Sequence, residues 1–117
     1  MNGTDPWVVA IVRKLVERLV ASDFAAVEHL TGGIRLPREA IEQAIRDYGG
    51  ELVMPPEIAF TNLDVIEVGA ADPPRLSIRF DLWTISEGRS DLTLELTLVD
   101  DSGNGQWRAE LDNIHVL

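Results

Sequence analysis

Few side chains in this sequence are of types that carry out acid–base chemistry near neutral pH. The chain holds one tyrosine, Tyr48, and two histidines, of which His115 lies close to the C-terminal end. An imidazole close to a phenol can act as a general base, because imidazole titrates near neutrality. We therefore name Tyr48, Asn113 and His115 as the candidate lining of a ligand pocket. No catalytic residues are assigned, because a lone histidine without a partner does not define a reaction.

The spacing of potential metal ligands does not indicate a metal site. The two histidines lie far apart, and the chain has no cysteine, so paired zinc ligands are absent from the sequence. The acidic turn DDSGNGQ at residues 100–106 lacks the alternating aspartates and the terminal glutamate of a calcium loop. The sequence therefore predicts neither a metal nor a cofactor.

The composition is that of an ordinary globular protein, with 45% hydrophobic and 26% charged residues. A chain of 117 residues without a linker is typical of one domain, so we expect a single domain over residues 1–117. The N-terminus lacks a basic segment followed by an apolar run, and no window approaches the roughly 18 apolar residues that cross a bilayer. We expect a cytoplasmic protein that does not bind membranes.

The net charge of −10 is placed unevenly along the chain. Residues 1–50 hold six Lys and Arg against seven acids, whereas residues 51–117 hold four Arg against thirteen acids. The second part therefore carries −9 of the charge. Such a field repels nucleic acids and attracts a basic partner. Solubility alone also favours an acidic surface, so the charge does not identify a function by itself.

The first part of the chain has the periodicity of helices and the second part that of strands. Apolar residues recur every three or four positions after Pro6, with Thr4 or Asp5 as the helix cap. We expect three helices within residues 5–49: one that follows Pro6, one from Phe24 to about Leu30, and one that starts at Pro37 and stops at Gly49-Gly50. We expect the sheet within residues 57–117, with strands at Asn62–Val68, Arg75–Ile85, Ser90–Asp100 and Gln106–Leu117. The predicted class is α+β, with the helices packed on one face of a curved antiparallel sheet.

The two central strands predict their own register. If Ser86–Gly88 is a three-residue loop, every apolar residue meets an apolar residue on one face. Those pairs are Leu82–Leu92, Phe80–Leu94, Ile78–Leu96 and Leu76–Leu98, with Ile85 closing against Arg89. The opposite face then pairs Arg79 with Glu95, Asp81 with Thr93 and Trp83 with Asp91. In the last strand, Asp112 and Asn113 interrupt the apolar alternation, which predicts a β-bulge.

The order of helices and strands resembles the cystatin-like α+β roll of nuclear transport factor 2-like and SnoaL-like domains. The segments YGGELVMPP, FDLWTISEGRSDLTLE and ELDNIHVL are more specifically similar to a small stand-alone bacterial domain family of unknown function. The resemblance to the roll implies that an enzyme pocket would lie between the helices and the sheet. The leucine face that would line such a pocket holds no titratable side chain, so we expect it to be a filled core.

The polar face of the sheet is the candidate surface for a protein partner. Trp83 stands there among charged residues, and tryptophan and arginine are enriched at binding hot spots. The predicted protein-binding residues are Arg79, Asp81, Trp83, Asp91, Glu95, Arg108 and Glu110. The favoured interpretation is a non-enzymatic domain that engages a basic protein, in the manner of immunity proteins that neutralise a toxin. The alternatives are a SnoaL-like domain that binds a small ligand or acts as an enzyme, and a structural homodimer that pairs through the sheet.

Overall fold

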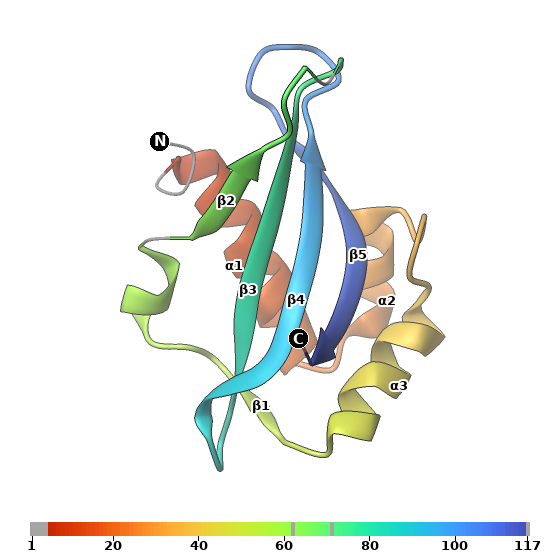
Figure 1. The fold of residues 1–117 in the computed structure, drawn as a ribbon. Helices are drawn as coiled ribbons and strands as arrows, with labels where there is room; N and C mark the ends of the chain where they lie inside the picture. Colours follow the sequence, from red (N-terminus) through yellow and green to blue (C-terminus); the bar gives the residue numbers. More distant parts are fainter. Residues whose placement is uncertain (1–4, 62, 71, 117) are drawn as a thin grey trace.

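The computed structural model of the protein describes residues 5–61, 63–70 and 72–116. Within them the chain forms three α-helices, one 3-10 helix and five strands (Figure 1). The helices come first and an antiparallel sheet follows, which confirms the predicted α+β class. None of these helices is both long and apolar enough to cross a bilayer. Three positions in the predicted elements, Thr4, Asn62 and Leu117, lie outside the described residues.

Helix α1 (Pro6–Val20) begins as the sequence predicts. The carboxylate of Asp5 accepts a hydrogen bond from the backbone N–H of Trp7 at 2.8 Å, and Pro6 occupies the first helical position. Both residues suit a helix start, because the first N–H groups have no partner within the helix. The side of α1 that faces the sheet is fully apolar and consists of Val8, Val12, Leu15, Val16 and Leu19.

The two shorter helices begin differently, because a side chain caps α2 and none caps α3. Asp23 caps α2 (Phe24–Thr31), with its carboxylate accepting from the backbone N–H of Ala26. Helix α3 (Arg38–Tyr48) starts one residue later than predicted, because the expected first residue is its cap. It ends at Gly49, whose φ of 85° is a left-handed conformation that costs glycine little.

All pairings in the sheet are antiparallel, and β3 lies at its centre. On one side of β3 come β4 and then β5; on the other side, β1 and β2 share the same edge of β3. The sheet therefore starts at residue 52 and not at the predicted residue 57. The bounds are β1 (Leu52–Val53), β2 (Asp64–Glu67), β3 (Arg75–Thr84), β4 (Gly88–Val99) and β5 (Arg108–Val116), with the 3-10 helix η2 (Glu57–Phe60) between β1 and β2.

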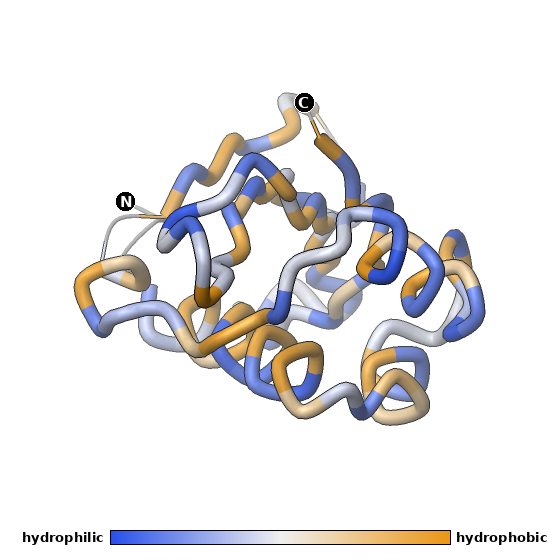
Figure 2. The backbone as a smooth tube through the Cα atoms, turned by 90° about the horizontal axis from the view of Figure 1, so that it is seen from below, coloured by the Kyte–Doolittle hydropathy of each residue, from blue (hydrophilic) through white to orange (hydrophobic). Residues whose placement is uncertain are grey.

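The helices cover only one face of the sheet. Figure 2, which looks at the molecule from below, shows the helical coils gathered on one side of the strands. The leucine face of the sheet meets the apolar side of α1, and its side chains are buried in one hydrophobic core. The sheet contributes Leu76, Ile78, Phe80, Leu82, Leu92, Leu94, Leu96, Leu98, Ala109 and Leu111 to this core.

The predicted register of β3 and β4 is correct over most of their length and wrong at the hairpin end. Leucine and isoleucine pairs meet as predicted from Leu76–Leu98 to Phe80–Leu94. Beyond Asp81 the register shifts, so that Trp83 pairs with Arg89 in place of Asp91 and Thr84 pairs with Gly88. The predicted pairs Leu82–Leu92 and Ile85–Arg89 therefore do not form.

Ser90 provides the physical reason for this shift. Its buried hydroxyl donates to the backbone carbonyl of Leu82 at 2.7 Å and accepts from the backbone N–H of Leu92 at 3.2 Å. The side chain takes over hydrogen bonds that strand pairing would otherwise make, so β4 accommodates extra residues at this point. The hairpin loop is then residues 85–87, and Gly88, with a φ of 72°, opens β4.

The predicted bulge in the last strand is confirmed. Glu95 pairs with Asn113 while Leu96 pairs with Leu111, so Asp112 is the extra residue of β5. The bulge keeps both Leu111 and Ile114 on the buried face, although two polar residues separate them.

Helix η2 is held against α1 by an arginine that makes two kinds of contact. The Arg13 guanidinium hydrogen-bonds both carboxylate oxygens of Glu57, at 2.9 and 2.5 Å. It also lies 4.5 Å from the ring centroid of Phe60, which stacks on Phe80 with centroids 5.1 Å apart. The hydrogen bond from Arg13 lowers the pKa of Glu57 below its ordinary value.

This lowered pKa predicts a pH-dependent contribution to stability. A carboxylate whose pKa is depressed in the folded state stabilises the fold above its unfolded pKa, and the contribution is lost as the pH falls through the folded pKa. We expect Glu57→Gln to be less stable than the wild type at pH 7, with the difference closing below about pH 4. Urea unfolding at a series of pH values measures it; a constant difference down to pH 3 would contradict it.

Candidate functional site

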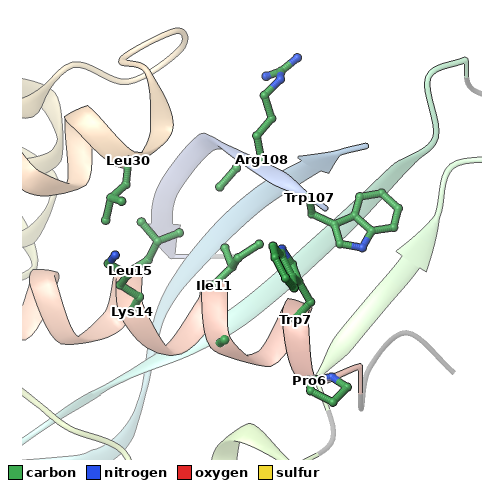
Figure 3. A pocket seen from close by; sticks show the side chains of 10 residues that line it. Pro6, Trp7, Ile11, Lys14, Leu15, Leu30, Trp107 and Arg108 are labelled. Atoms are coloured by element: carbon green, nitrogen blue, oxygen red, sulfur yellow. The ribbon is translucent and has the colours of Figure 1, made fainter. Parts of the chain in front are cut away.

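An apolar groove lies where α1, α2 and the start of β5 meet (Figure 3). Its volume is about 520 Å³. Trp7, Ile11 and Lys14 line it from α1, and Trp107 lines it from the segment before β5. The remaining lining residues are Pro6, Ala10, Leu15, Leu30, Arg108 and Ala109.

The sequence predictions did not include this groove. The core stripe of α1 begins at Val8, but Trp7, Ile11 and Lys14 form a second row at helical spacing beside it. Trp7 is 48% exposed, which is unusual for a tryptophan that belongs to a core. This second row on α1 was the sequence signal for the groove. The row faces Trp107, which comes from the far end of the chain, and no local sequence pattern connects the row with Trp107.

The three predicted pocket residues are only partly brought together. Tyr48 and His115 line one shallow hollow of about 430 Å³, together with Ala44, Asp47, Leu92, Ile114 and Val116. Asn113 does not line it; its side-chain oxygen accepts from the backbone N–H of Ile114.

Tyr48 and His115 are each engaged by a carboxylate. The Tyr48 hydroxyl donates to Glu87 at 2.7 Å, and that hydrogen bond raises the pKa of Tyr48. The His115 ring nitrogen Nε2 lies 2.5 Å from a carboxylate oxygen of Glu95. Within the described residues no hydrogen bond joins Tyr48 to His115, so the acid–base pair that the sequence suggested is not formed.

Most of the predicted protein-binding residues lie on the sheet face that no helix covers. On this face Arg79 pairs with Glu95, and its Nε lies 3.3 Å from the carboxylate. Asp81 lies next to this pair; it accepts from the Thr93 hydroxyl at 3.0 Å and forms an ion pair with Arg89 at 3.7 Å. The acids predicted to attract a basic partner are therefore partly neutralised by arginines of the same face.

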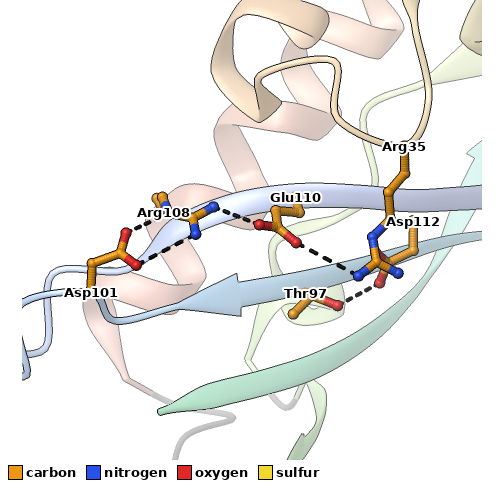
Figure 4. A network of polar contacts seen from close by, with 6 residues as sticks. All are labelled: Arg35, Thr97, Asp101, Arg108, Glu110 and Asp112. Carbon is orange, nitrogen blue, oxygen red and sulfur yellow. Dashed lines mark hydrogen bonds and ion pairs between the residues drawn. The ribbon is translucent and has the colours of Figure 1, made fainter. Parts of the chain in front are cut away.

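Arg108 and Glu110 belong to a chain of polar contacts at the β5 edge (Figure 4). Arg108 binds Asp101 on one side and Glu110 on the other, at 2.5 and 2.6 Å. Arg35, from the loop between α2 and α3, then approaches Glu110 at 3.9 Å and Asp112 at 3.3 Å. These contacts fix the bulged strand against the helical part of the chain, so we assign Arg108 and Glu110 a structural role.

Asp91 is separated from the other predicted residues by the register shift. It is exposed in the altered stretch of β4, and its backbone N–H points to the Tyr48 hydroxyl at 3.4 Å. Its predicted neighbour Trp83 pairs with Arg89 instead. The predicted protein-binding residues thus divide into three parts. The central group contains Trp83, Arg79, Asp81 and Glu95; the other two parts are the pair Arg108 and Glu110, and Asp91 alone.

A hollow of about 420 Å³ lies beside Trp83 at the edge of β3, where residues of the open face and of the core both line it. It forms because β1 and β2 share one edge of β3 without meeting: β1 pairs with residues 83–84 and β2 with residues 76–79. Between them Pro55-Pro56 cannot continue a strand, and the chain turns outward through η2. The lining is Ile58, Ala59, Leu63, Asp64, Arg79, Phe80, Asp81, Trp83 and Arg89.

An exposed apolar side chain lines this hollow, and another follows Trp83 by two residues in the chain. Ile58 is 76% exposed, and Ile85, in the hairpin loop after β3, is 64% exposed. Trp83 is half-buried, with the ring against Gly88, and Val53 pairs with it from β1. We call Val53, Ile58, Trp83 and Ile85 the Trp83 patch. An apolar centre with charged residues at its border is the anatomy of a protein interface.

The described residues offer no metal centre, since no three His, Cys, Asp or Glu side chains among them come together in a way that could hold an ion. The fold and the surfaces define an α+β domain with one helix-covered and one open sheet face. Residues 16–117 match the model of the family described as Domain of unknown function (DUF7668), and the chain belongs to that family. No curated protein and no solved structure matches the chain.

The contacts of Asp112 predict that the polar network contributes to stability. Its carboxylate accepts from the Thr97 hydroxyl at 2.6 Å and pairs with Arg35. We expect Asp112→Ala to lower the free energy of unfolding by about 1–2 kcal/mol, because a hydrogen bond to a charged group is lost. Urea unfolding measures the change.

Asp91→Ala is the matched control for this substitution. It removes an exposed carboxylate of the same face that makes no side-chain contact with a cation among the described residues, so we expect a change within about 0.5 kcal/mol. Equal effects of the two substitutions would contradict a stabilising network at the bulge.

Proposed function

We propose that the protein is a non-enzymatic binding domain that docks a protein partner on its open sheet face, centred on the Trp83 patch. The observation that supports the proposal is the half-buried Trp83 in a hollow that the exposed Ile58 also lines, with the exposed Ile85 two residues after Trp83. Aromatic side chains in partly desolvated pockets carry much of the energy of protein interfaces. A partner with one protruding apolar side chain fits such a hollow.

The charge of the chain favours a basic partner over a second copy. The net charge is −10, whereas the hollow itself is lined by two acids, Asp64 and Asp81, and two arginines, Arg79 and Arg89. Two copies would each carry a net charge of −10, which opposes their association. A basic partner gains from the same field. The structural homodimer therefore has less support than a heterologous complex.

A role of the immunity type, in which the domain neutralises a basic toxin in the cytoplasm, is the specific form of the proposal that the sequence suggests. Its support is the small size and acidity of the chain together with the patch. The SnoaL-like alternative has less support, because its candidate residues Tyr48 and His115 are engaged by Glu87 and Glu95.

The proposal is tested by capture of a partner from the native host, followed by measurement with the purified pair. We expect Trp83→Ala to weaken the complex about 30-fold, the effect of losing roughly 2 kcal/mol at a hot spot. Raising the salt concentration should slow association, because the acidic field steers a basic partner. Isothermal titration calorimetry and stopped-flow kinetics measure the two effects.

Ile34→Ala provides the matched control. Ile34 is 62% exposed but lies between α2 and α3, away from the patch, so its loss should leave the affinity unchanged. Circular dichroism confirms that each variant is folded. Binding that survives Trp83→Ala in a folded protein would overturn the proposed surface. Salt-independent association would overturn the proposed chemistry of the partner.

The same proposal predicts the oligomeric state of the isolated protein. We expect a monomer in sedimentation-velocity experiments at low ionic strength, because two chains with a net charge of −10 repel each other. A stable dimer that dissociates on Trp83→Ala would assign the patch to self-association instead.

A further inference from the structure

We propose that the groove between α1 and β5 binds a small amphipathic anion, with its carboxylate at Lys14 and its apolar body along Trp7 and Ile11. The site is distinct from the Trp83 patch, and the inference does not rest on the docking proposal. It rests on three features of the groove: its form, the exposure of its apolar wall and the charge at its mouth.

The form of the groove is that of a small-molecule site. Its volume of about 520 Å³ lies within the range of roughly 300–1,000 Å³ typical of ligand pockets. Its walls come from three elements, and Figure 3 shows Trp7 and Ile11 rising from α1 towards the segment that carries Trp107 and Arg108. Ligand sites typically combine such apolar walls with a few polar groups that orient the ligand.

The apolar wall is exposed in a way that folding alone does not require. Helix α1 already buries a complete stripe, from Val8 to Leu19, against the sheet. Trp7 stands outside that stripe, and nearly half of its surface remains accessible. Covering such a surface with an apolar ligand removes it from water at a gain of roughly 25 cal/mol per Å². The exposed wall thus supplies affinity for the body of a ligand.

The charge at the mouth selects the sign of the ligand. Arg108 is paired with Asp101 and Glu110, so these two carboxylates already balance its charge. The same contacts raise the pKa of Arg108. Lys14, the single lysine of the chain, makes no hydrogen bond or ion pair with any described residue. Most arginines of the chain, in contrast, are paired with acids. An ammonium without a counter-charge beside an apolar groove complements a carboxylate head group.

Decanoate, below its micelle concentration, is the probe for the test. The Trp83→Phe variant leaves only Trp7 and Trp107 as tryptophans, and both line the groove. We expect decanoate to shift their fluorescence emission to shorter wavelength and to saturate at one molecule per chain. Decanol, which has the same tail without the charge, should bind about fivefold more weakly, the effect of one exposed ion pair.

Three variants distinguish the contribution of the ligand's head group to the affinity from the contribution of its tail. Lys14→Met keeps the length of the side chain and removes the charge, so it should bring decanoate down to the affinity of decanol. Arg18→Met removes the same charge one turn further along α1, outside the groove, and should have little effect. Ala10→Phe adds a ring at an exposed position of the groove wall and should abolish binding of both probes.

Several outcomes would overturn the inference. Tighter binding of decyltrimethylammonium than of decanoate would show that the groove prefers cations. An Ala10→Phe variant that binds decanoate normally would place the probe elsewhere on the protein. Equal losses from Lys14→Met and Arg18→Met would show that general charge, and not a carboxylate site, controls the affinity. Circular dichroism excludes unfolding as the cause of any loss.

Discussion

The pairing of the apolar faces of β3 and β4 is the interaction on which the rest of the structure depends. Side chains alternate strictly along a strand, so a register that matches leucine with leucine on one face fixes every residue on the other. The leucine face then requires a cover of similar area, which α1 supplies with its apolar stripe. Because all three helices gather on that side, the opposite face is left open.

Ion pairs on the open face explain how the chain folds stably although its negative charge is concentrated in residues 51–117. The four arginines of residues 51–117 belong to β3, β4 and β5, where their register alternates with that of the buried leucines. Three of them meet acids of the same face or the adjoining loop, and Arg13 and Arg35 from the helical part reach Glu57 and Asp112. The pairs are exposed, so each contributes little to stability. Their main effect is to reduce repulsion within the acidic part of the molecule.

The separation along the chain between two interacting residues decides whether the sequence could predict their contact. The strand period predicted the register of β3 and β4, and the change of parity around Asp112 predicted the bulge, because both patterns are local. The hairpin shift was missed, because it depends on one hydroxyl, Ser90, replacing backbone partners. The Arg35 contacts and the groove were missed because each joins the first helices to the last strand, and nothing in a single sequence registers such contacts.

Both proposed sites arise where the regular pattern of the fold is interrupted. The hollow beside Trp83 exists because two prolines divide what would be one edge strand into β1 and β2, which leaves the middle of β3 partly uncovered. The groove exists because Trp107 precedes β5, so that the chain enters the sheet beside the exposed row of α1. A strict alternation of leucines fills a core and leaves no space for a ligand. Binding surfaces in this fold must therefore be sought at its interruptions, and two of these interruptions carry tryptophans that are not fully buried, Trp83 and Trp7.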